Sequence, residues 1–251
     1  MAVFSDYSRC YDLLYAEKDY EAEASYVVRY IRSIKPDSSS ILDLGCGTGR
    51  HARCFASHGF NVHGVDLSPQ MIEIARNEQT ESPGTTFEVG DVRLVRLARK
   101  FDCVLSLFHV MSYQIDNQDI RNAFCTASEH TVPGGAFIFD CWYGPGVLTD
   151  PPTTRVKRAF SDHLNVMRIA EPTVCSLENV VQVDYSLRLE QNDPPNEKWI
   201  YESHRMRYWF VPEVKQMLHE AGFRFCQVYK WMSDDPPSID TWNAMFVCSK
   251  I

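Results

Sequence analysis

The sequence has no arrangement of cysteines that would cross-link a fold or hold a metal. Its nine cysteines are odd in number and none belongs to a C-x-x-C pair, so we expect reduced thiols rather than a disulfide framework or a zinc site. The chain also lacks any run of about 18 apolar residues, which excludes a membrane-spanning helix. Its opening residues lack the basic and apolar regions of a secretion signal, so we expect a soluble, cytoplasmic protein.

The chain also lacks an excess of positive charge. Its 25 Lys and Arg residues stand against 33 Asp and Glu residues, a formal net charge of −8, and no basic cluster stands out. DNA or tRNA would require a basic surface for its phosphates, so neither is expected as a partner. With 251 residues, 45% of them hydrophobic, the chain can bury one sizeable core.

Apolar segments of strand length alternate with amphipathic segments of helix length over most of the chain. Strands are predicted at 41–44, 61–65, 85–89, 101–107, 136–140, 223–230 and 242–248, and helices at 21–34, 50–58, 69–78, 117–130 and 212–221. Such alternation is typical of an α/β fold with a doubly wound sheet. We therefore predict a seven-stranded, Rossmann-like sheet in which a closing hairpin leaves one strand antiparallel.

The segment 145–209 differs from the rest because its apolar residues occupy every second position. Strands are predicted at 155–160 and 164–170, and a hairpin is predicted between about 181 and 209 with its turn at 192–196. We expect a small antiparallel β insertion after the fifth strand. The predicted domains are thus a main domain of residues 1–144 and 210–251, and an inserted subdomain of residues 145–209 that covers the active site.

The apolar segment 41–44 runs into a turn with glycines at positions 45, 47 and 49. Glycine has no Cβ, so these residues can take positive φ and let a ligand lie against the backbone near a helix N-terminus. The dinucleotide fingerprint G-x-G-x-x-G would place its third glycine at position 50, where this chain has Arg50. This spacing disfavours NAD and FAD.

Two acids follow the next predicted strands. Asp66 comes 21 residues after Gly45, a spacing at which an acid can accept hydrogen bonds from ribose hydroxyls. The same stretch also fits a helix start with Ser68 as the capping residue. Asp91 follows the strand predicted at 85–89, and taken alone it would be a loop residue.

Together with Asp43, the pattern D-x-G-x-G-x-G and the two later acids resemble the class I S-adenosyl-L-methionine (SAM) methyltransferases. The resemblance implies SAM as the cofactor, with Asp66 at its ribose, Asp91 at the adenine amino group and Val92 on the adenine ring. The implied cofactor-binding residues are Tyr20, Asp43, Gly45, Cys46, Gly47, Asp66, Leu67, Met71, Asp91, Val92 and Phe108.

A narrower resemblance spans nearly the whole chain. The residues that carry it are Tyr11–Tyr15, Lys18–Ala24, Ser39–Asp43, Gly45–Gly49, Gly90-Asp91, Pro133–Gly135, the Trp142 region and Glu202–Arg205. They are similar to the N,N-dimethyltransferases of nucleotide-linked 3-amino deoxysugars, as in desosamine- and mycaminose-type pathways. The chain departs from that family at 108–113, where the relatives have a serine-rich stretch, and at 140–143, where they have a Glu-Pro-Trp-Trp-like turn.

The resemblance implies an enzyme that N-methylates a nucleotide-linked aminosugar, a small molecule. Its acceptor would meet Trp142, Tyr143, Arg205 and Arg207, the two arginines being expected at the phosphates because residues i and i+2 share one face of a strand. A solvated strand face explains these arginines equally well. A methyltransferase for another small-molecule amine or hydroxyl, and a non-catalytic SAM-binding regulator, are the alternatives. The sequence predicts no oligomeric state.

Few side chains are needed for the chemistry, because a sulfonium methyl is already activated and needs a close, oriented and dry nucleophile. An amine can lose its proton to water, whereas a hydroxyl needs a strong base. The candidates near the methyl are Tyr15, His109 and Tyr113. Tyr7 and Tyr11 could equally belong to a packed helix face with Tyr15, and His109 could equally be a wall of the pocket.

A metal site is not expected. His51, His58 and His63 lie close in sequence but have no carboxylates at ligand spacing. A magnesium-dependent O-methyltransferase would want acids directly after the fourth strand, where the chain has residues 106–113 without any acid.

Overall fold

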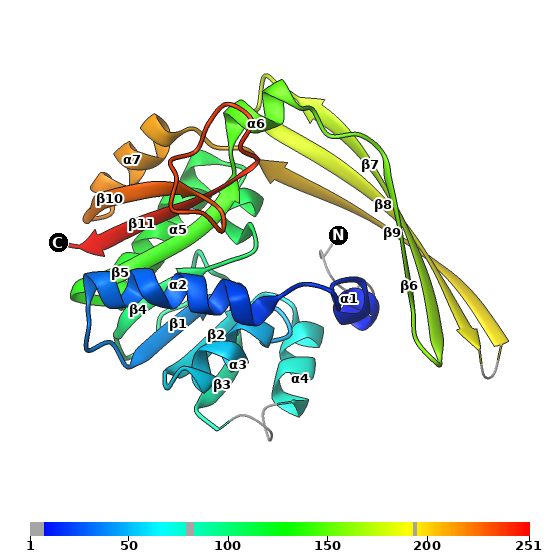
Figure 1. The fold of residues 1–251 in the computed structure, drawn as a ribbon, viewed down its shortest axis with the longest axis horizontal. Coiled ribbons are helices and arrows are strands. Elements are labelled where there is room, and N and C mark those ends of the chain that lie inside the picture. Colours follow the sequence, from blue (N-terminus) through cyan, green and yellow to red (C-terminus); the bar gives the residue numbers. More distant parts are fainter. Residues whose placement is uncertain (1–7, 79–82, 193–194) are drawn as a thin grey trace.

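The computed structural model describes residues 8–78, 83–192 and 195–251 and folds them into two sheets flanked by helices (Figure 1). Tyr7 lies outside the described residues. The larger sheet has seven strands in the order β10-β11-β5-β4-β1-β2-β3. These strands are β1 (Ser40–Leu44), β2 (Asn61–Asp66), β3 (Thr85–Val89), β4 (Phe101–Ser106), β5 (Thr131–Trp142), β10 (Phe223–Lys230) and β11 (Asn243–Lys250).

Parallel pairing joins β1 through β5 of this sheet, and β11 is antiparallel to both of its neighbours. The predicted doubly wound, seven-stranded sheet with one reversed strand is therefore confirmed. Residues 231–242 connect β10 to β11 without a helix, whereas a parallel pair is usually joined by a helical crossover.

Helices cover both faces of the seven-stranded sheet. They are α2 (Tyr20–Ile34), α3 (Arg50–Ser57), α4 (Pro69–Asn77), α5 (Asn117–His130) and α7 (Val211–Glu220). Apolar residues of α2, α3 and α4 belong to one buried cluster, and those of α5 and α7 belong to the other. No helix of the described residues is long and apolar enough to cross a membrane.

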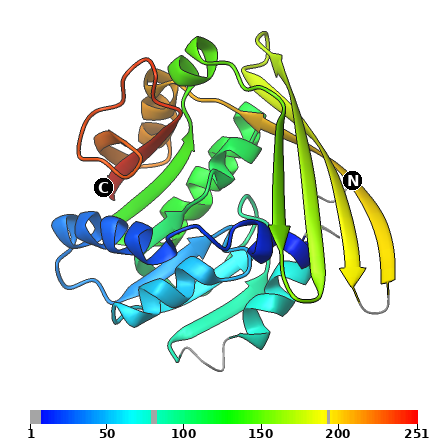
Figure 2. The same cartoon turned by 45° about the vertical axis from the view of Figure 1, so that its right-hand side comes forward.

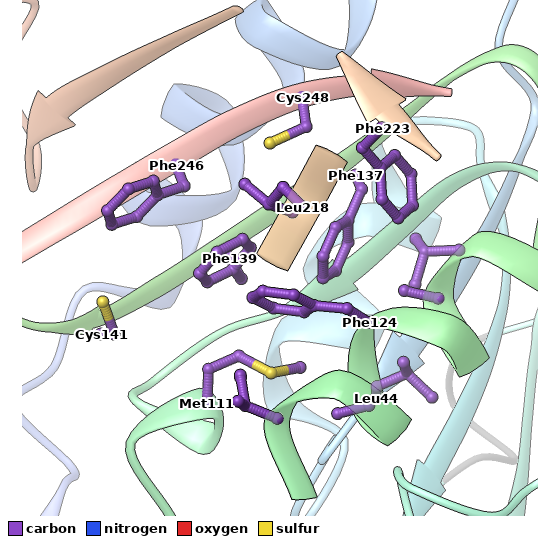
Figure 3. Packing of buried hydrophobic residues seen from close by; sticks show 14 of the residues in the cluster. Leu44, Met111, Phe124, Phe137, Phe139, Cys141, Leu218, Phe223, Phe246 and Cys248 are labelled. Atoms are coloured by element: carbon purple, nitrogen blue, oxygen red, sulfur yellow. The ribbon is translucent and has the colours of Figure 1, made fainter. Parts of the chain in front are cut away.

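The alternation of side chains along β5 distributes residues between these two clusters. Phe137 and Phe139 pack against Phe124 of α5 and Leu218 of α7 (Figure 3), while Ile138 between them faces the cluster of α2. The Phe124 ring lies 5.2 Å from that of Phe139. A strand buried on both faces reads as a continuous apolar run, which is why residues 136–139 gave no period in the sequence.

The second sheet is antiparallel, in the order β6-β7-β8-β9. Its strands are β6 (Arg155–Phe160), β7 (Leu164–Cys175), β8 (Val180–Asn192) and β9 (Pro195–Arg207). The short helix α1 (Ser8–Leu14) packs on it through Cys10 and Leu14, which contact the cluster of Val166, Leu187 and Ile200. Figures 1 and 2 place α1 between this sheet and the rest of the molecule.

Several elements differ from the prediction. The helix α1 includes Tyr11, for which the sequence offered a packed helix face as one of two alternatives. The sequence did not predict the turn of 3-10 helix η2 (Val110–Tyr113) or the helix α6 (Gly144–Thr149). Strand β7 also runs on to Cys175, through Pro172, beyond its predicted end at 170. Strand β6 pairs with β7 only up to Ala170, so Pro172 lies where one side of β7 has no partner strand, a position at which proline is tolerated.

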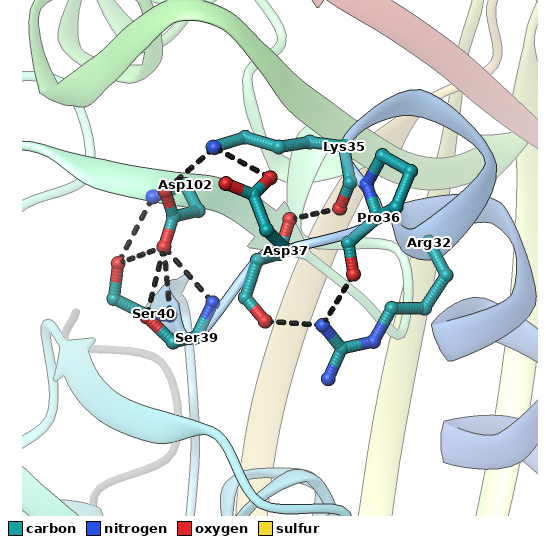
Figure 4. Close-up of polar contacts among 8 residues, drawn as sticks. Arg32, Lys35, Pro36, Asp37, Ser39, Ser40 and Asp102 are labelled. Atoms are coloured by element: carbon teal, nitrogen blue, oxygen red, sulfur yellow. Dashed lines mark hydrogen bonds and ion pairs between the residues drawn. The ribbon is translucent and has the colours of Figure 1, made fainter.

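Asp102, the second residue of β4, ties that strand to the start of β1 (Figure 4). Its Oδ2 accepts hydrogen bonds from the backbone N–H groups of Ser39 and Ser40 at 2.9 and 3.1 Å, and from the Ser40 hydroxyl at 2.9 Å. Lys35 Nζ lies 3.5 Å from its other oxygen. Burial acts to raise the pKa of Asp102, but the hydrogen bonds from Ser39 and Ser40 outweigh it and lower the pKa.

We expect Asp102→Ala to lower the free energy of unfolding by about 1–3 kcal/mol at pH 7, because two backbone donors would lose their acceptor. The sign follows from the lowered pKa: the contribution exists above the unfolded value near 3.9 and is lost as the pH falls through the lower folded value. Urea unfolding at pH 7 and pH 3 measures both. Asp37→Ala, which removes an exposed partner of Lys35, is the control and should leave the midpoint nearly unchanged; equal effects would contradict the role of Asp102.

Candidate active site

A cavity of about 350 Å³ lies at the carboxyl ends of strands β1 to β5 and is bounded on one side by the four-stranded sheet. Ligands of doubly wound folds bind at this edge of the sheet. All three predicted catalytic residues and all eleven predicted cofactor residues line the cavity. Of the four predicted acceptor residues, Trp142 alone does so.

The glycine turn forms the floor of the cavity. A Cβ on Gly45 would come within 2.5 Å of the Val110 side chain, and the φ of Gly45 is +82°. Gly47, with φ +56°, faces open space instead. The turn thus needs glycine at 45 for a close approach, and at 47 it presents bare backbone to whatever occupies the cavity.

Asp66 joins this turn to the start of α4. Its Oδ2 accepts a hydrogen bond from the Gly47 N–H at 2.8 Å, and its Oδ1 accepts one from the Ser68 N–H at 2.9 Å. Burial raises the pKa of Asp66 although these two donors act to lower it. The Ser68 hydroxyl accepts from the Met71 N–H, which confirms Ser68 as the capping residue of α4.

Asp43 lies in the same cavity, one strand position before Leu44, and is only 2% exposed. Burial, and then the negative charge of Asp66, raise the pKa of Asp43 to about 7. A ligand with a positive group would favour the ionised form of both acids. The ammonium and sulfonium of SAM have the required sign.

At the third strand tip, Asp91 is already paired. Arg93 donates to both of its oxygens, from Nε at 2.9 Å and from Nη2 at 2.6 Å, and this pairing lowers the pKa of Asp91. Arg93 also reaches Asp119 at 2.8 Å. An adenine amino group would therefore share Asp91 with Arg93, a contact that sequence reasoning missed. Val92 is buried beside it and lines the cavity.

Aromatic side chains form the opposite end of the cavity. The Tyr15 ring packs edge-on to Phe108 with 5.1 Å between centroids, and the Tyr15 hydroxyl accepts a hydrogen bond from Arg168 Nη1 at 3.0 Å. Lys18 Nζ lies 4.6 Å above the Phe108 ring. Trp142 completes this end from β5. We call Tyr15, Phe108, Tyr113 and Trp142 the aromatic end of the cavity.

The turn after β4 holds two side chains toward the aromatic end. Phe108 and His109 both have positive φ, +65° and +66°, a conformation that costs energy for residues other than glycine and is common at functional sites. Asp140, 1% exposed, fixes the turn: its Oδ1 accepts from the His109 N–H at 3.2 Å, and its Oδ2 lies 2.7 Å from His109 Nδ1. That ring nitrogen makes no aligned hydrogen bond to a described residue.

Three predicted acceptor residues lie away from the cavity. Residues 204 and 206 of β9 line it, so the pleat sends Arg205 and Arg207 to the other face of the sheet. Arg205 pairs with Glu178 there. The prediction of these arginines at the phosphates used the correct i, i+2 spacing but the wrong face.

Arg207 also makes its contacts away from the cavity. It lies 2.9 Å from Glu213 and stacks 3.9 Å over the Trp209 ring. Tyr143 follows Trp142 on the chain but packs against the buried cluster of α5 and α7 and does not line the cavity. Neither Tyr143 nor Arg207 lines the cavity, against the acceptor roles predicted for them. Alternation along a strand shows which residues share a face, but the face that meets the cavity is known only once the sheet is placed.

Sequence reasoning also missed residues that line the cavity. They are Tyr11, Thr48, Arg50, His51, Ser68, Arg93, Leu107, Val110, Gln114, Tyr185, His204 and Met206. His204 and Tyr185 come from the four-stranded sheet, and His204 lies within the stretch Glu202–Arg205 that resembles the aminosugar enzymes. That stretch was the available signal. Among the described ranges, no three His, Cys, Asp or Glu side chains gather in a way that could hold a metal.

Comparison with known proteins identifies the family. Residues 41–135 match the family model described as a methyltransferase domain. A Streptomyces venezuelae protein named dTDP-3-amino-3,4,6-trideoxy-alpha-D-glucopyranose N,N-dimethyltransferase is 37% identical over 147 residues, 58% of this chain and 61% of that protein. A demethylmenaquinone methyltransferase of Tropheryma whipplei is 32% identical over 165 residues, 63% of this chain and 67% of that protein. The chain belongs to the SAM-dependent methyltransferases.

The fold of this methyltransferase is shared over its full length with a solved relative. The crystal structure of Streptomyces venezuelae DesVI matches it with a TM-score of 0.81 at 26% identity, over 98% of this chain and 99% of that one. The sequence matches to the first curated relatives are shorter and span 61% and 58% of those proteins.

The cavity fits SAM by two observations. The bare backbone at Gly47 leaves room for a ligand over the glycine turn, and two buried acids, Asp43 and Asp66, offer negative charge to a cation. Tyr20, Cys46, Leu67 and Met71 would surround it from the cavity wall. SAM supplies the methyltransferase with an activated methyl group on a sulfonium.

We expect Asp66→Ala to weaken SAM binding by about 1–3 kcal/mol, because it removes the acceptor for ribose hydroxyls and unties the Gly47 turn. Titration calorimetry measures the affinity. Asp37→Ala, in the connector at the amino end of β1, is the matched control and should bind SAM as the wild type does. An unchanged affinity in Asp66→Ala would contradict the ribose assignment, and NAD should give no binding heat.

Asp43 predicts a proton release. With a pKa of about 7, its carboxyl is largely protonated at pH 6.5, and bound positive charge lowers that pKa. SAM binding at pH 6.5 should therefore release up to about three-quarters of a proton and should strengthen as the pH rises through 7. Calorimetry in two buffers of different ionisation enthalpy counts the protons. The Asp43→Asn variant should release fewer protons on SAM binding. Equal proton release by the variant and the wild type would show that the protons come from another group.

Proposed function

We propose that this methyltransferase transfers methyl groups from SAM to the amine of a nucleotide-linked aminosugar. The observation that carries the proposal is one cavity that continues from the glycine turn to the aromatic end. Relatives named as dTDP-aminosugar N,N-dimethyltransferases, at 37% and 32% identity, support the choice of acceptor.

In this proposal, the site has two ends with separate tasks. The cofactor end comprises the glycine turn with Asp43, Asp66, Asp91 and Val92. The acceptor end comprises the aromatic end and His109. Residues 145–209, proposed as an inserted subdomain, would cover the acceptor end and leave the cofactor end to the main domain.

The four-stranded sheet offers a different basic residue for the nucleotide. A second cavity of about 380 Å³ shares Tyr15, Phe108 and His109 with the first and is also lined by Lys18 and Lys157. Lys18 is paired with Glu23, whereas Lys157 of β6 lies 5.5 Å from the Tyr15 ring centroid. We propose that Lys157 takes the role at the phosphates that the sequence had given to Arg205 and Arg207.

The chain accelerates the transfer mainly by positioning. The aromatic end excludes water from the nucleophile, and Tyr15 and Tyr113 orient it by hydrogen bonding. Arg168 holds the Tyr15 hydroxyl at 3.0 Å, which fixes the direction in which that hydroxyl points. An amine acceptor must be neutral when it attacks.

A hydroxyl acceptor is the second candidate, and one observation favours it. His109 stands where the aminosugar enzymes have a serine-rich stretch, and its Nδ1 lies 2.7 Å from the buried Asp140. A His with a carboxylate partner is a general base of the kind that a hydroxyl would need. Two added methyls in the mass spectrum indicate the amine, because a single hydroxyl gains one, and fragmentation locates a single added methyl on nitrogen or oxygen.

We expect a panel of nucleotide-linked aminosugars to include a substrate that gains one or two methyl groups. Lys157→Met should raise its KM about 10-fold and change kcat little, because the phosphate contact is made equally before and during transfer. Lys100→Met, at the amino end of β4 away from the cavity, is the control. No product from any nucleotide aminosugar, together with turnover of a nucleotide-free amine or alcohol, would transfer support to the alternative acceptors.

A further inference from the structure

His204 and Glu202 of β9 form a line of hydrogen bonds that begins at the hydroxyl of Tyr113. Tyr113 Oη lies 2.9 Å from His204 Nδ1, and His204 Nε2 lies 3.0 Å from Glu202 Oε2. Glu202 and His204 are two positions apart on the strand, so both point to the cavity face of the sheet. Their side chains are 7% and 1% exposed. Tyr113 itself lies in the main domain, so this line of contacts crosses between the two sheets.

Glu202 determines which atom donates in each hydrogen bond of the line. When Glu202 is ionised, its carboxylate can only accept, so His204 Nε2 then carries the hydrogen that is donated to it. The neutral ring then has its lone pair on Nδ1, which accepts the O–H of Tyr113. A carboxylate that fixes the tautomer of a histidine in this way also stabilises the imidazolium that forms when the ring takes a second proton.

Tyr113 and His204 both line the cavity, whereas Glu202 lies behind them. Burial, and then the neighbouring Tyr185, Tyr15 and Glu202, raise the pKa of Tyr113 well above its usual value, while Arg168 acts to lower it. These groups come from β8, the segment after α1, β9 and β7. A phenol in this position does not lose its proton to water at neutral pH, so any proton that it gives up must pass directly to a base that it contacts.

We propose that Tyr113, His204 and Glu202 form a proton line that accepts the proton of the methylated amine. This inference rests on the proposed function for its substrate. As the N–C bond forms and the C–S bond breaks, the acceptor nitrogen becomes positively charged. Its N–H proton passes to Tyr113 Oη, and the phenolic proton passes to His204 Nδ1. The positive charge that entered with the methyl group ends on His204, paired with Glu202.

In this assignment Tyr113 is the catalytic residue, and His204 and Glu202 are positioning residues that act through it. Proton transfer requires aligned hydrogen bonds, which the line has and the ring of His109 lacks toward Asp140. His109 lies close to Asp140, but its Nδ1 makes no aligned hydrogen bond to a described residue, whereas both contacts of His204 are hydrogen bonds. The line also serves dimethylation, because each transfer leaves one proton to be removed.

The tautomer of His204 tests the line without any substrate. Nitrogen-15 NMR of protein with labelled histidine, assigned by comparison with His204→Gln, distinguishes a protonated Nε2 from a protonated Nδ1. The proposal requires the Nε2–H form at pH 7.5. The Nδ1–H form would overturn it, because His204 would then donate to Tyr113 and could not take its proton. This result is independent of whether an aminosugar is the acceptor.

Kinetics test the line with substrate. His204→Gln and Glu202→Gln should each lower kcat about 100-fold while KM and SAM affinity change little. An unchanged kcat in His204→Gln or Glu202→Gln would overturn the proposal.

Tyr208→Phe is the matched control for removing a buried polar group near the end of β9. The Tyr208 side chain is fully buried, its hydroxyl has no hydrogen-bond partner among the described residues, and it does not line the cavity. It should keep the wild-type kcat and pH profile. Thermal unfolding and SAM binding of every variant show whether it is folded. If His204→Gln does not fold, Tyr113→Phe with the same kinetic measurements and the tautomer measurement on the wild type still decide the question.

Discussion

The site depends on the parallel pairing of β1 with β2 on one side and with β4 on the other. This pairing places the glycine turn after β1 between the loops that follow its two neighbours. Asp66 from β2 can then accept from the Gly47 N–H, and Val110 from the β4 side packs within contact of Gly45. A turn that must pass this close to its neighbours admits only glycine at position 45.

The cofactor end was predictable because its signals are local. Glycines at fixed spacing and acids at strand tips require only that β1, β2 and β3 be parallel and adjacent, which alternation of strands and helices already implies. Every residue predicted for SAM lines the cavity accordingly. The pairing of Asp91 with Arg93 was not predicted, because a hydrogen bond between neighbouring side chains does not appear in the apolar periodicity of the sequence.

The acceptor end was less predictable because it depends on which face of a strand points inward. Alternation divides β9 into two sets, His204 with Met206 and Arg205 with Arg207, and the sequence does not say which set faces the cavity. Chemical expectation chose the arginines for phosphate, and the pleat places the other pair in the cavity. The position of α1 had the same difficulty, because its contacts are with strands more than 140 residues away.

Both sheets are needed to build the acceptor end. The Tyr15 hydroxyl is held by Arg168 of β7, and the Tyr113 hydroxyl is held by His204 of β9, so each candidate orienting group takes its direction from the four-stranded sheet. The cofactor end has no such dependence, because Asp66 and Asp91 make their contacts with residues after β1, β2 and β3. Changes in the four-stranded sheet can therefore alter which nucleophile is held, and in what protonation state, while the geometry of the glycine turn and its acids stays as it is.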